Sequence, residues 1–204
     1  MKNIFLLLSI VCLPHTRSFA QEPVNLNEYV FKAGDVLEYE VNKMGKTYSL
    51  IITLTGKTFI DSKITDAITF DWEIKNDTTM KGAVSISKEA RVDASIYKTE
   101  FINGPIILKN KSCLWLSLGG LYSLISEDGA TMDAGDGNKS VYTIIPGLGD
   151  NYNFLFKGKP GYISAFQAKT TSSACQFSFC PTQNSNALIL TIDMGWTMRL
   201  KEVR

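Results

Sequence analysis

Two pairs of carboxylates, Glu38 with Glu40 and Asp71 with Glu73, have the spacing that comes nearest to a catalytic pair. Residues two apart on a strand share one face, with roughly 6.5–7 Å between their Cα atoms. This separation is compatible with the paired acids of glycoside hydrolases. Both pairs alternate with apolar residues, however, and Lys75 continues the second row, which is typical of the solvated face of an amphipathic strand. A carboxylate-based hydrolase is therefore the least favoured of three hypotheses for the function of this protein.

Histidine, the commonest general base, occurs once in the sequence, as His15. The start of the chain has the pattern of a secretory signal peptide. Lys2 is followed by an apolar run over residues 4–13, and small residues precede a predicted cleavage at Ala20/Gln21. Loss of residues 1–20 removes the histidine. The mature chain then lacks the base of a Ser-His-Asp or Cys-His mechanism and the imidazole ligand of most zinc sites. We therefore expect a protein that is not an enzyme.

The segment from Asp133 to Asn138 is the candidate for an ion site. The carboxylates of Asp133 and Asp136 and the amide of Asn138 offer oxygen ligands of the kind that Ca²⁺ prefers. Glycines at the third and fifth positions depart from the EF-hand spacing, and Asp, Gly and Asn are also the residues of tight turns. We expect a turn here, with a calcium site as the alternative, and no cofactor elsewhere.

Three cysteines remain after removal of the signal segment: Cys113, Cys175 and Cys180. An oxidising compartment favours one disulfide and one free thiol among them. A Cys175–Cys180 bridge closes the shortest loop, but it requires residues 176–179 to turn back, because an extended strand would separate the two Cα atoms by roughly 16 Å. This pair is the disulfide candidate, and Cys113 is the alternative partner.

Strands must position most of these residues. Leu37, Tyr39 and Val41 alternate with polar residues, and the alternation resumes at 48–54 beyond a turn at 43–46, which predicts a β-hairpin. The pattern recurs to the end of the chain at near-regular spacing. We therefore expect residues 21–204 to form a single antiparallel all-β domain of about a dozen strands.

A few segments depart from this alternation. Ser87 is a candidate cap for a helical turn, and the apolar spacing from Leu118 to Ile125 predicts a second short helix. Thr58 to Asp61 is a predicted short strand. Asn103-Gly104 predicts a hairpin turn before the apolar residues 106–108.

Aromatic and apolar side chains recur on the inward rows of the predicted strands. A curved sheet lined in this way can hold an apolar ligand, although a closed, solid core uses the same side chains. The candidate ligand contacts are Tyr39, Leu50, Phe70, Trp72, Trp115 and Trp196.

Four segments carry a resemblance to a known group of proteins: 31–41 (Phe-Lys-Ala-Gly-Asp-Val-Leu-Glu-Tyr-Glu-Val), 87–94, 114–117 and 186–203. The chain resembles a family of exported β-rich proteins of unknown function from Bacteroides-type and other Gram-negative bacteria. The resemblance implies an envelope location and a curved antiparallel sheet or incomplete barrel, lipocalin-like or a half-barrel. It implies no catalytic residues.

The charge balance and the hydropathy of the sequence limit the kinds of partner that the protein can bind. Two of the 21 basic residues lie in positions 1–20, and the others nearly balance the 20 acidic residues without forming a basic cluster, so we expect no nucleic-acid partner. No later apolar run approaches membrane length, so we expect no transmembrane segment after processing. The leading hypothesis is a non-enzymatic periplasmic or cell-surface protein that binds an apolar small molecule or lipid. The alternative is an envelope interaction or assembly module that binds another envelope protein and has no small-molecule site.

Overall fold

The computed structural model describes residues 22–56, 67–75, 77–98, 101–135, 137–146, 149–172, 174–181 and 186–204. The predicted signal peptide, its cleavage site and the predicted strand at Thr58–Asp61 lie outside these ranges. Asp136 of the candidate calcium segment also lies outside them.

Fourteen strands and two short helices form the described part of the chain, which confirms the predicted all-β class. The first seven strands are β1 (Val24–Asn25), β2 (Val36–Lys43), β3 (Lys46–Leu54), β4 (Ile68–Ile74), β5 (Asp77–Ile86), β6 (Gly104–Leu108) and β7 (Trp115–Leu116). The other seven are β8 (Ala130–Asp133), β9 (Lys139–Ile144), β10 (Asp150–Phe156), β11 (Lys159–Thr170), β12 (Gln176–Pro181), β13 (Ala187–Asp193) and β14 (Thr197–Val203). Helix α1 (Lys88–Asp93) follows β5, and helix α2 (Leu118–Ser126) follows β7.

The predicted opening hairpin is formed by β2 and β3. Lys43 lies directly opposite Lys46, so the loop consists of Met44 and Gly45 alone. Both loop residues have positive φ, 52° and 72°, which is the type I′ geometry that matches the twist of the flanking strands. The predicted inward row of β2 is buried, and Glu40 on the opposite row is exposed.

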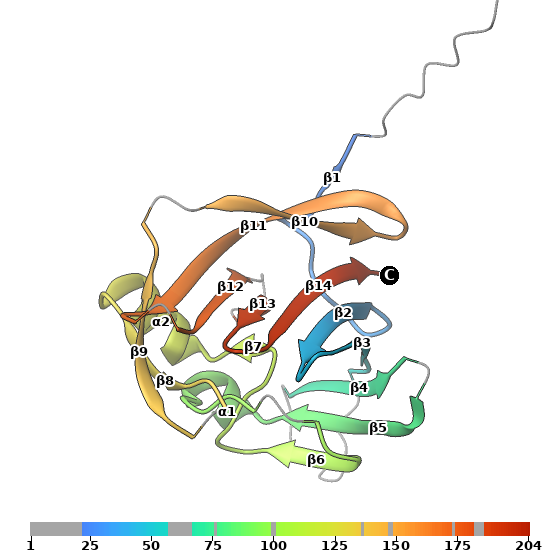
Figure 1. The fold of residues 1–204 in the computed structure, drawn as a ribbon, viewed down its shortest axis with the longest axis horizontal. Helices are drawn as coiled ribbons and strands as arrows, with labels where there is room; N and C mark the ends of the chain where they lie inside the picture. The colour runs from blue at the N-terminus through green and yellow to red at the C-terminus, as the bar shows by residue number, and fades with distance from the viewer. Residues whose placement is uncertain are drawn as a thin grey trace, which may run out of the picture.

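Strand β14 is the branch point of the sheet (Figure 1). One of its edges pairs with β2, whereas the other pairs first with β13 and then, near the C-terminus, with β10. Because β13 continues through β12 and β11 to β10, strands β10 to β14 close into a five-stranded barrel. Strands β2 to β6 extend the sheet from the other edge of β14 and leave it open.

Most strand pairs are antiparallel, as predicted, but β1 with β11, β10 with β14 and β5 with β6 are parallel. The predicted hairpin at Asn103-Gly104 is therefore wrong. Gly104 begins β6, which pairs with the preceding strand β5 in the same direction. A parallel pair needs a crossover connection, and helix α1 lies in the connection between β5 and β6.

The two helices are joined through their caps. The Ser87 hydroxyl accepts a hydrogen bond from the Ala90 N–H at 3.3 Å, which confirms the predicted cap of α1. Ser117 caps α2 by accepting from the Gly120 N–H at 3.1 Å, and its hydroxyl also donates to the Ala94 carbonyl, at the end of α1, at 2.7 Å. The Tyr97 hydroxyl accepts from the Ser117 N–H at 3.2 Å, so this junction holds the segment after α1 in place.

Candidate functional site

The predicted ligand contacts fall into two groups, of which the first belongs to the core. Tyr39 and Phe70 are fully buried, and the Tyr39 hydroxyl donates a hydrogen bond to the Ile189 carbonyl on β13 at 2.9 Å. Trp115 is also buried, with its ring centroid 5.5 Å from that of Phe70, and it lines a separate hollow next to α1 and β4. For Tyr39 and Phe70 the solid-core alternative therefore holds.

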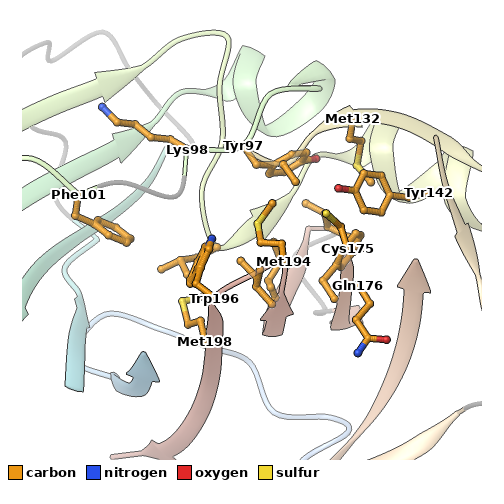
Figure 2. A pocket seen from close by; sticks show the side chains of 16 residues that line it. Tyr97, Lys98, Phe101, Met132, Tyr142, Cys175, Gln176, Met194, Trp196 and Met198 are labelled. Carbon is orange, nitrogen blue, oxygen red and sulfur yellow. The ribbon is translucent and has the colours of Figure 1, made fainter. Parts of the chain in front are cut away.

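The second group, Leu50, Trp72 and Trp196, lines an apolar groove. We define the groove as two adjoining hollows that share Phe101, Trp196 and Met198. The outer hollow lies along the inward rows of β2 to β4 and the start of β14. The inner hollow lies among β7, β8, β12 and β13 and the segment that begins at Tyr97 (Figure 2). The sequence therefore identified three of the groove residues correctly as inward-facing.

Trp196 separates the two hollows. It precedes β14 and follows Gly195, whose φ of 78° allows a tight turn in which the Met194 N–H donates to the Trp196 carbonyl at 3.0 Å. The period of two then places Trp196 on the same row as the buried Met198 and Leu200. Trp196 itself is only partly buried. An indole ring is thus available at the point where the core row meets the groove.

Methionines are concentrated around this groove. Met132, Met194 and Met198 line the inner hollow and Met80 lines the outer one, whereas Met44 is exposed at the tip of the opening hairpin. Methionine is unbranched and polarisable, and it packs favourably against aromatic rings and against ligands of different shapes. The lining is therefore suited to an apolar ligand and can adjust to it.

The two hollows differ in size. The centre of a water molecule can occupy about 40 Å³ of the inner hollow and about 260 Å³ of the outer one. Because a single water needs roughly 10–15 Å³ by this measure, the inner hollow admits only a few water-sized groups. The outer hollow can take a larger body, and the inner one the narrow end of a chain.

Lysines supply the charge at the groove. Lys43 lines the outer hollow and Lys98 the inner one, and no Asp or Glu occurs among the described lining residues of either. The Lys43 ammonium lies 5.8 Å from the centre of the Trp196 ring, within the range of a cation–π interaction. Burial raises the pKa of the Tyr48 and Tyr97 phenols, which therefore stay neutral. The groove is apolar with positive charge.

The carboxylate pairs lie outside the groove. Glu38 is bound by Lys75 at 3.0 Å and Arg204 at 2.9 Å. Partial burial raises the pKa of Glu38, but hydrogen bonds from Lys75 and Ser49 and the two nearby positive charges outweigh it, so the pKa is lowered. A carboxylate held ionised in this way is unsuited to act as a general acid.

The second carboxylate pair, Asp71 and Glu73, lines a wide hollow on the opposite face of β3 to β5 from the groove. Lys81 lies directly across from Glu73 on the neighbouring strand. Opposite charges at a directly opposed pair of strand positions stabilise the sheet. This arrangement is that of a surface row, as the alternation in the sequence predicts.

The three cysteines in the described part of the chain, Cys113, Cys175 and Cys180, are free thiols. The predicted Cys175–Cys180 bridge is not formed, because β12 is an extended strand between the two residues and does not turn back. The alternative with Cys113 is not formed either. Burial raises the pKa of both Cys113 and Cys180 to about 12, whereas Cys175 is partly exposed and lines the inner hollow.

The candidate calcium segment forms a turn in its described part. One carboxylate oxygen of Asp133, Oδ1, accepts hydrogen bonds from the backbone N–H groups of Gly135 and Gly137 at 2.8 and 3.1 Å. This is the side-chain-to-backbone turn that Asp favours. Among the described residues no group of three acidic, cysteine or histidine side chains is placed to hold a metal ion.

Most of the groove residues were not predicted as ligand contacts, and Lys43, Lys98, Phe101 and Met194 are among them. Lys43 carried a signal, because it occupies the next inward position after Tyr39 and Val41, where a lysine is unexpected in a solid core. Lys98 and Phe101 carried none, since the sequence around them shows no clear alternation of apolar and polar residues. Met194 lies in a turn, and only the turn geometry directs it toward the groove (Figure 2).

Comparison of the chain with protein-family models, with curated proteins and with solved structures gave no significant match. The resemblance to an exported Gram-negative family therefore rests on the sequence segments alone. None of the helices in the described ranges is both long and apolar enough to cross a membrane.

Proposed function

We propose that this protein is exported to the periplasm or cell surface and binds an apolar or amphipathic small molecule or lipid in the groove, without catalysing a reaction. The observation that carries the proposal is the composition of the groove. Its lining consists mainly of aliphatic, aromatic and methionine side chains, and it stays open where Trp196 is partly exposed. Such concave, largely apolar sites with a few polar groups are the usual form of a small-molecule site.

The export part of the proposal is supported by the sequence. The apolar run over residues 4–13 and the small residues before Gln21 have the pattern of a signal peptide, and the family resemblance points to the envelope. An aqueous envelope compartment contains lipids and other apolar molecules that need a protein cavity to stay in solution. A groove lined with methionine and aromatic side chains meets that need.

The test is a fluorescence titration of the mature protein with the neutral apolar probe N-phenyl-1-naphthylamine. Met194→Gln keeps the approximate size of the side chain but places an amide in the groove, which should weaken probe binding by roughly fivefold or more. Met44→Gln is the matched control, because Met44 is exposed at the hairpin tip and should leave the affinity unchanged. Equal effects of both substitutions, or no binding by the wild type, would refute the proposal.

The second candidate function is an envelope interaction module. Helix α2 favours it, because Tyr122 and Ile125 are 62% and 53% exposed and lie three residues apart on one helix face. Native mass spectrometry of the protein purified from its own envelope separates the two functions. A retained small molecule supports the groove proposal, and a retained protein without a small molecule supports the module.

A further inference from the structure

We propose that the mouth of the five-stranded barrel is a second binding site, which holds one neutral sugar ring through hydrogen bonds to the hydroxyl groups of the sugar. The site is a hollow lined by residues of all five barrel strands, β10 to β14 (Figure 1). Its lining is mainly polar, whereas that of the groove is mainly apolar. A sugar site here goes beyond the proposed function and does not depend on it.

The barrel opens at this end because β10 diverges from β14. In the register of the described strands the two pair only through Leu155 and Phe156 of β10, near the end of both strands. The residues of β10 that line the hollow, Asp150 to Tyr152, come before this pairing. The Tyr152 hydroxyl donates a hydrogen bond to the Leu200 carbonyl of β14 at 2.7 Å, so its side chain spans the gap and forms part of the wall.

The strand register places four of the polar lining side chains in one continuous row. Gln167 on β11 lies directly opposite Ser178 on β12, and Ser178 lies directly opposite Thr191 on β13. Thr191 in turn lies opposite Arg199 on β14. Directly opposed residues share one face of a sheet, with Cβ atoms about 4.5–5.5 Å apart. A carboxamide, two hydroxyls and a guanidinium are therefore successive neighbours along one wall of the hollow.

A β-bulge shapes the middle of this wall. The pairing of β12 with β13 shifts between Ser178 and Phe179. Beside the shift, the Thr191 hydroxyl accepts a hydrogen bond from the Ser178 N–H at 3.1 Å and lies 2.7 Å from the Ser178 hydroxyl. Bulges redirect side chains, and they are common at the rims of barrels and next to active sites. The bulge thus holds two hydroxyl groups together at the barrel mouth.

Several polar side chains around the hollow have no partner within the described part of the protein. The side chains of Gln167, Gln176 and Arg199 form no hydrogen bond or ion pair there. Arg199 lies directly opposite Glu40 on β2, yet the ion pair of Glu40 is with Lys201, at 4.0 Å. Arg199 lines the hollow instead. Its donors and those of the two carboxamides can therefore bind a ligand.

The charges around the hollow favour a neutral ligand. Two carboxylates, those of Asp150 and Asp193, accompany the single guanidinium of Arg199 among the described lining residues, so neither an anion nor a cation meets a wall of opposite charge. Carboxylates only accept hydrogen bonds, a guanidinium only donates them, and carboxamides and hydroxyls do both. A ligand hydroxyl can bind any of these groups, because it also does both. A ligand rich in hydroxyl groups therefore matches the whole lining.

An aromatic ring beside the polar row favours a sugar among such ligands. Burial raises the pKa of the Tyr152 phenol to about 12, and the charge of Arg199 opposes this rise, because the two side chains lie near each other. The Tyr152 ring is held in place by its hydrogen bond to Leu200. A tyrosine ring offers an apolar face. The C–H face of a sugar ring can pack against it while the hydroxyl groups reach the row.

The hollow has room for one sugar ring. The centre of a water molecule can occupy about 230 Å³ of it, many times the roughly 10–15 Å³ that one water needs. Phe154 and Ile163 lie on the same rows as Tyr152 and Ala165, farther from the mouth, and they are buried. The hollow therefore ends above the apolar interior of the barrel.

The experiment is a titration of the mature protein, followed in amide-correlation NMR spectra, with the methyl glycosides of glucose, galactose, mannose and N-acetylglucosamine. At least one should bind in the millimolar range and shift the amide signals of Gln167, Ser178 and Arg199. Arg199→Met should weaken that binding roughly tenfold, and Gln167→Met roughly threefold or more, because each removes a hydrogen-bonding group. Lys201→Met is the matched control, because it removes a positive charge from the same strand outside the hollow and should leave the affinity unchanged.

The charge of the ligand is tested with the uronic acid and the amino sugar of the same configuration as the tightest neutral binder. Both should bind several-fold more weakly than the neutral sugar. Tighter binding of either charged sugar would overturn the assignment of a neutral ligand. Binding of none of the four glycosides, or equal affinities for Arg199→Met, Gln167→Met and Lys201→Met, would overturn the site itself. Neither result bears on the groove, which is tested with its own probe.

Discussion

Gly82 on β5 offers a direct test of the packing around the groove. A Cβ atom at this position would lie 2.7 Å from Trp72 Nε1, 2.8 Å from the Gly104 carbonyl oxygen and 3.0 Å from the Ile102 carbonyl oxygen. Two of these three atoms belong to backbone, so they cannot rotate away. Register explains the crowding, since Gly82 pairs with Trp72 on one side and with Gly104 on the other.

Gly82→Ala should therefore destabilise the fold. Overpacking of a close-packed site costs about 1–3 kcal/mol, and the gain of about 0.5–1 kcal/mol from replacing a strand glycine offsets part of it. With two backbone contacts involved we expect the upper part of this range, a net loss of about 2 kcal/mol. For a chain of this size that corresponds to a fall in Tm of roughly 4–8 °C.

Urea unfolding followed by circular dichroism measures this loss. Gly149→Ala is the matched control, because a Cβ there meets nothing within 4 Å and its backbone does not have the positive φ that favours glycine. The double variant Gly82→Ala/Trp72→Phe should lose less stability than the two single changes added together, because the smaller ring withdraws from the added methyl. Equal unfolding midpoints for Gly82→Ala and Gly149→Ala would refute the reasoning.

Two further predictions concern titratable groups. Because the pKa of Glu38 is lowered on folding, the stability it contributes is present above the ordinary glutamate value of 4.5 and is lost as the pH falls through the lowered pKa. Glu38→Gln should therefore flatten the acid side of the curve of unfolding free energy against pH, and an unchanged curve would contradict this. A maleimide should label Cys175 in the native mature protein and reach Cys113 and Cys180 only after unfolding, as peptide mass spectrometry can show. Rapid native labelling of the buried pair would contradict the structure.

The inward-facing aromatic side chains of this protein have two distinct roles. Tyr39 and Phe70 stabilise the core, and the Tyr39 hydroxyl links β2 to β13 through the Ile189 carbonyl. Trp72 and Trp196 lie on equivalent inward rows but border space that other side chains leave open. An inward-facing aromatic residue therefore does not by itself indicate a groove, because burial on an inward row is common to both uses.

Several features followed from the sequence by itself. The period-two alternation identified the opening hairpin and most later strands, because side-chain direction along a strand depends only on the neighbouring residues. The cap of α1 was equally local, since the Ser87 hydroxyl accepts a hydrogen bond from a backbone N–H group three residues away. The balance of acidic and basic residues and the presence of a single histidine can also be read from the sequence without knowledge of any tertiary contact.

Tertiary structure alone decided how the rows face one another. Closure of the barrel depends on the pairing of β14 with both β13 and β10. The parallel pairing of β5 with β6 depends on a crossover through α1, and this pairing overrode the local turn signal at Asn103-Gly104. The groove combines β2 with Phe101 and with the turn before β14. Alternation along a strand is a property of nearby residues, whereas a cavity belongs to segments brought together by long-range strand pairing, and no local pattern encodes which of them will meet.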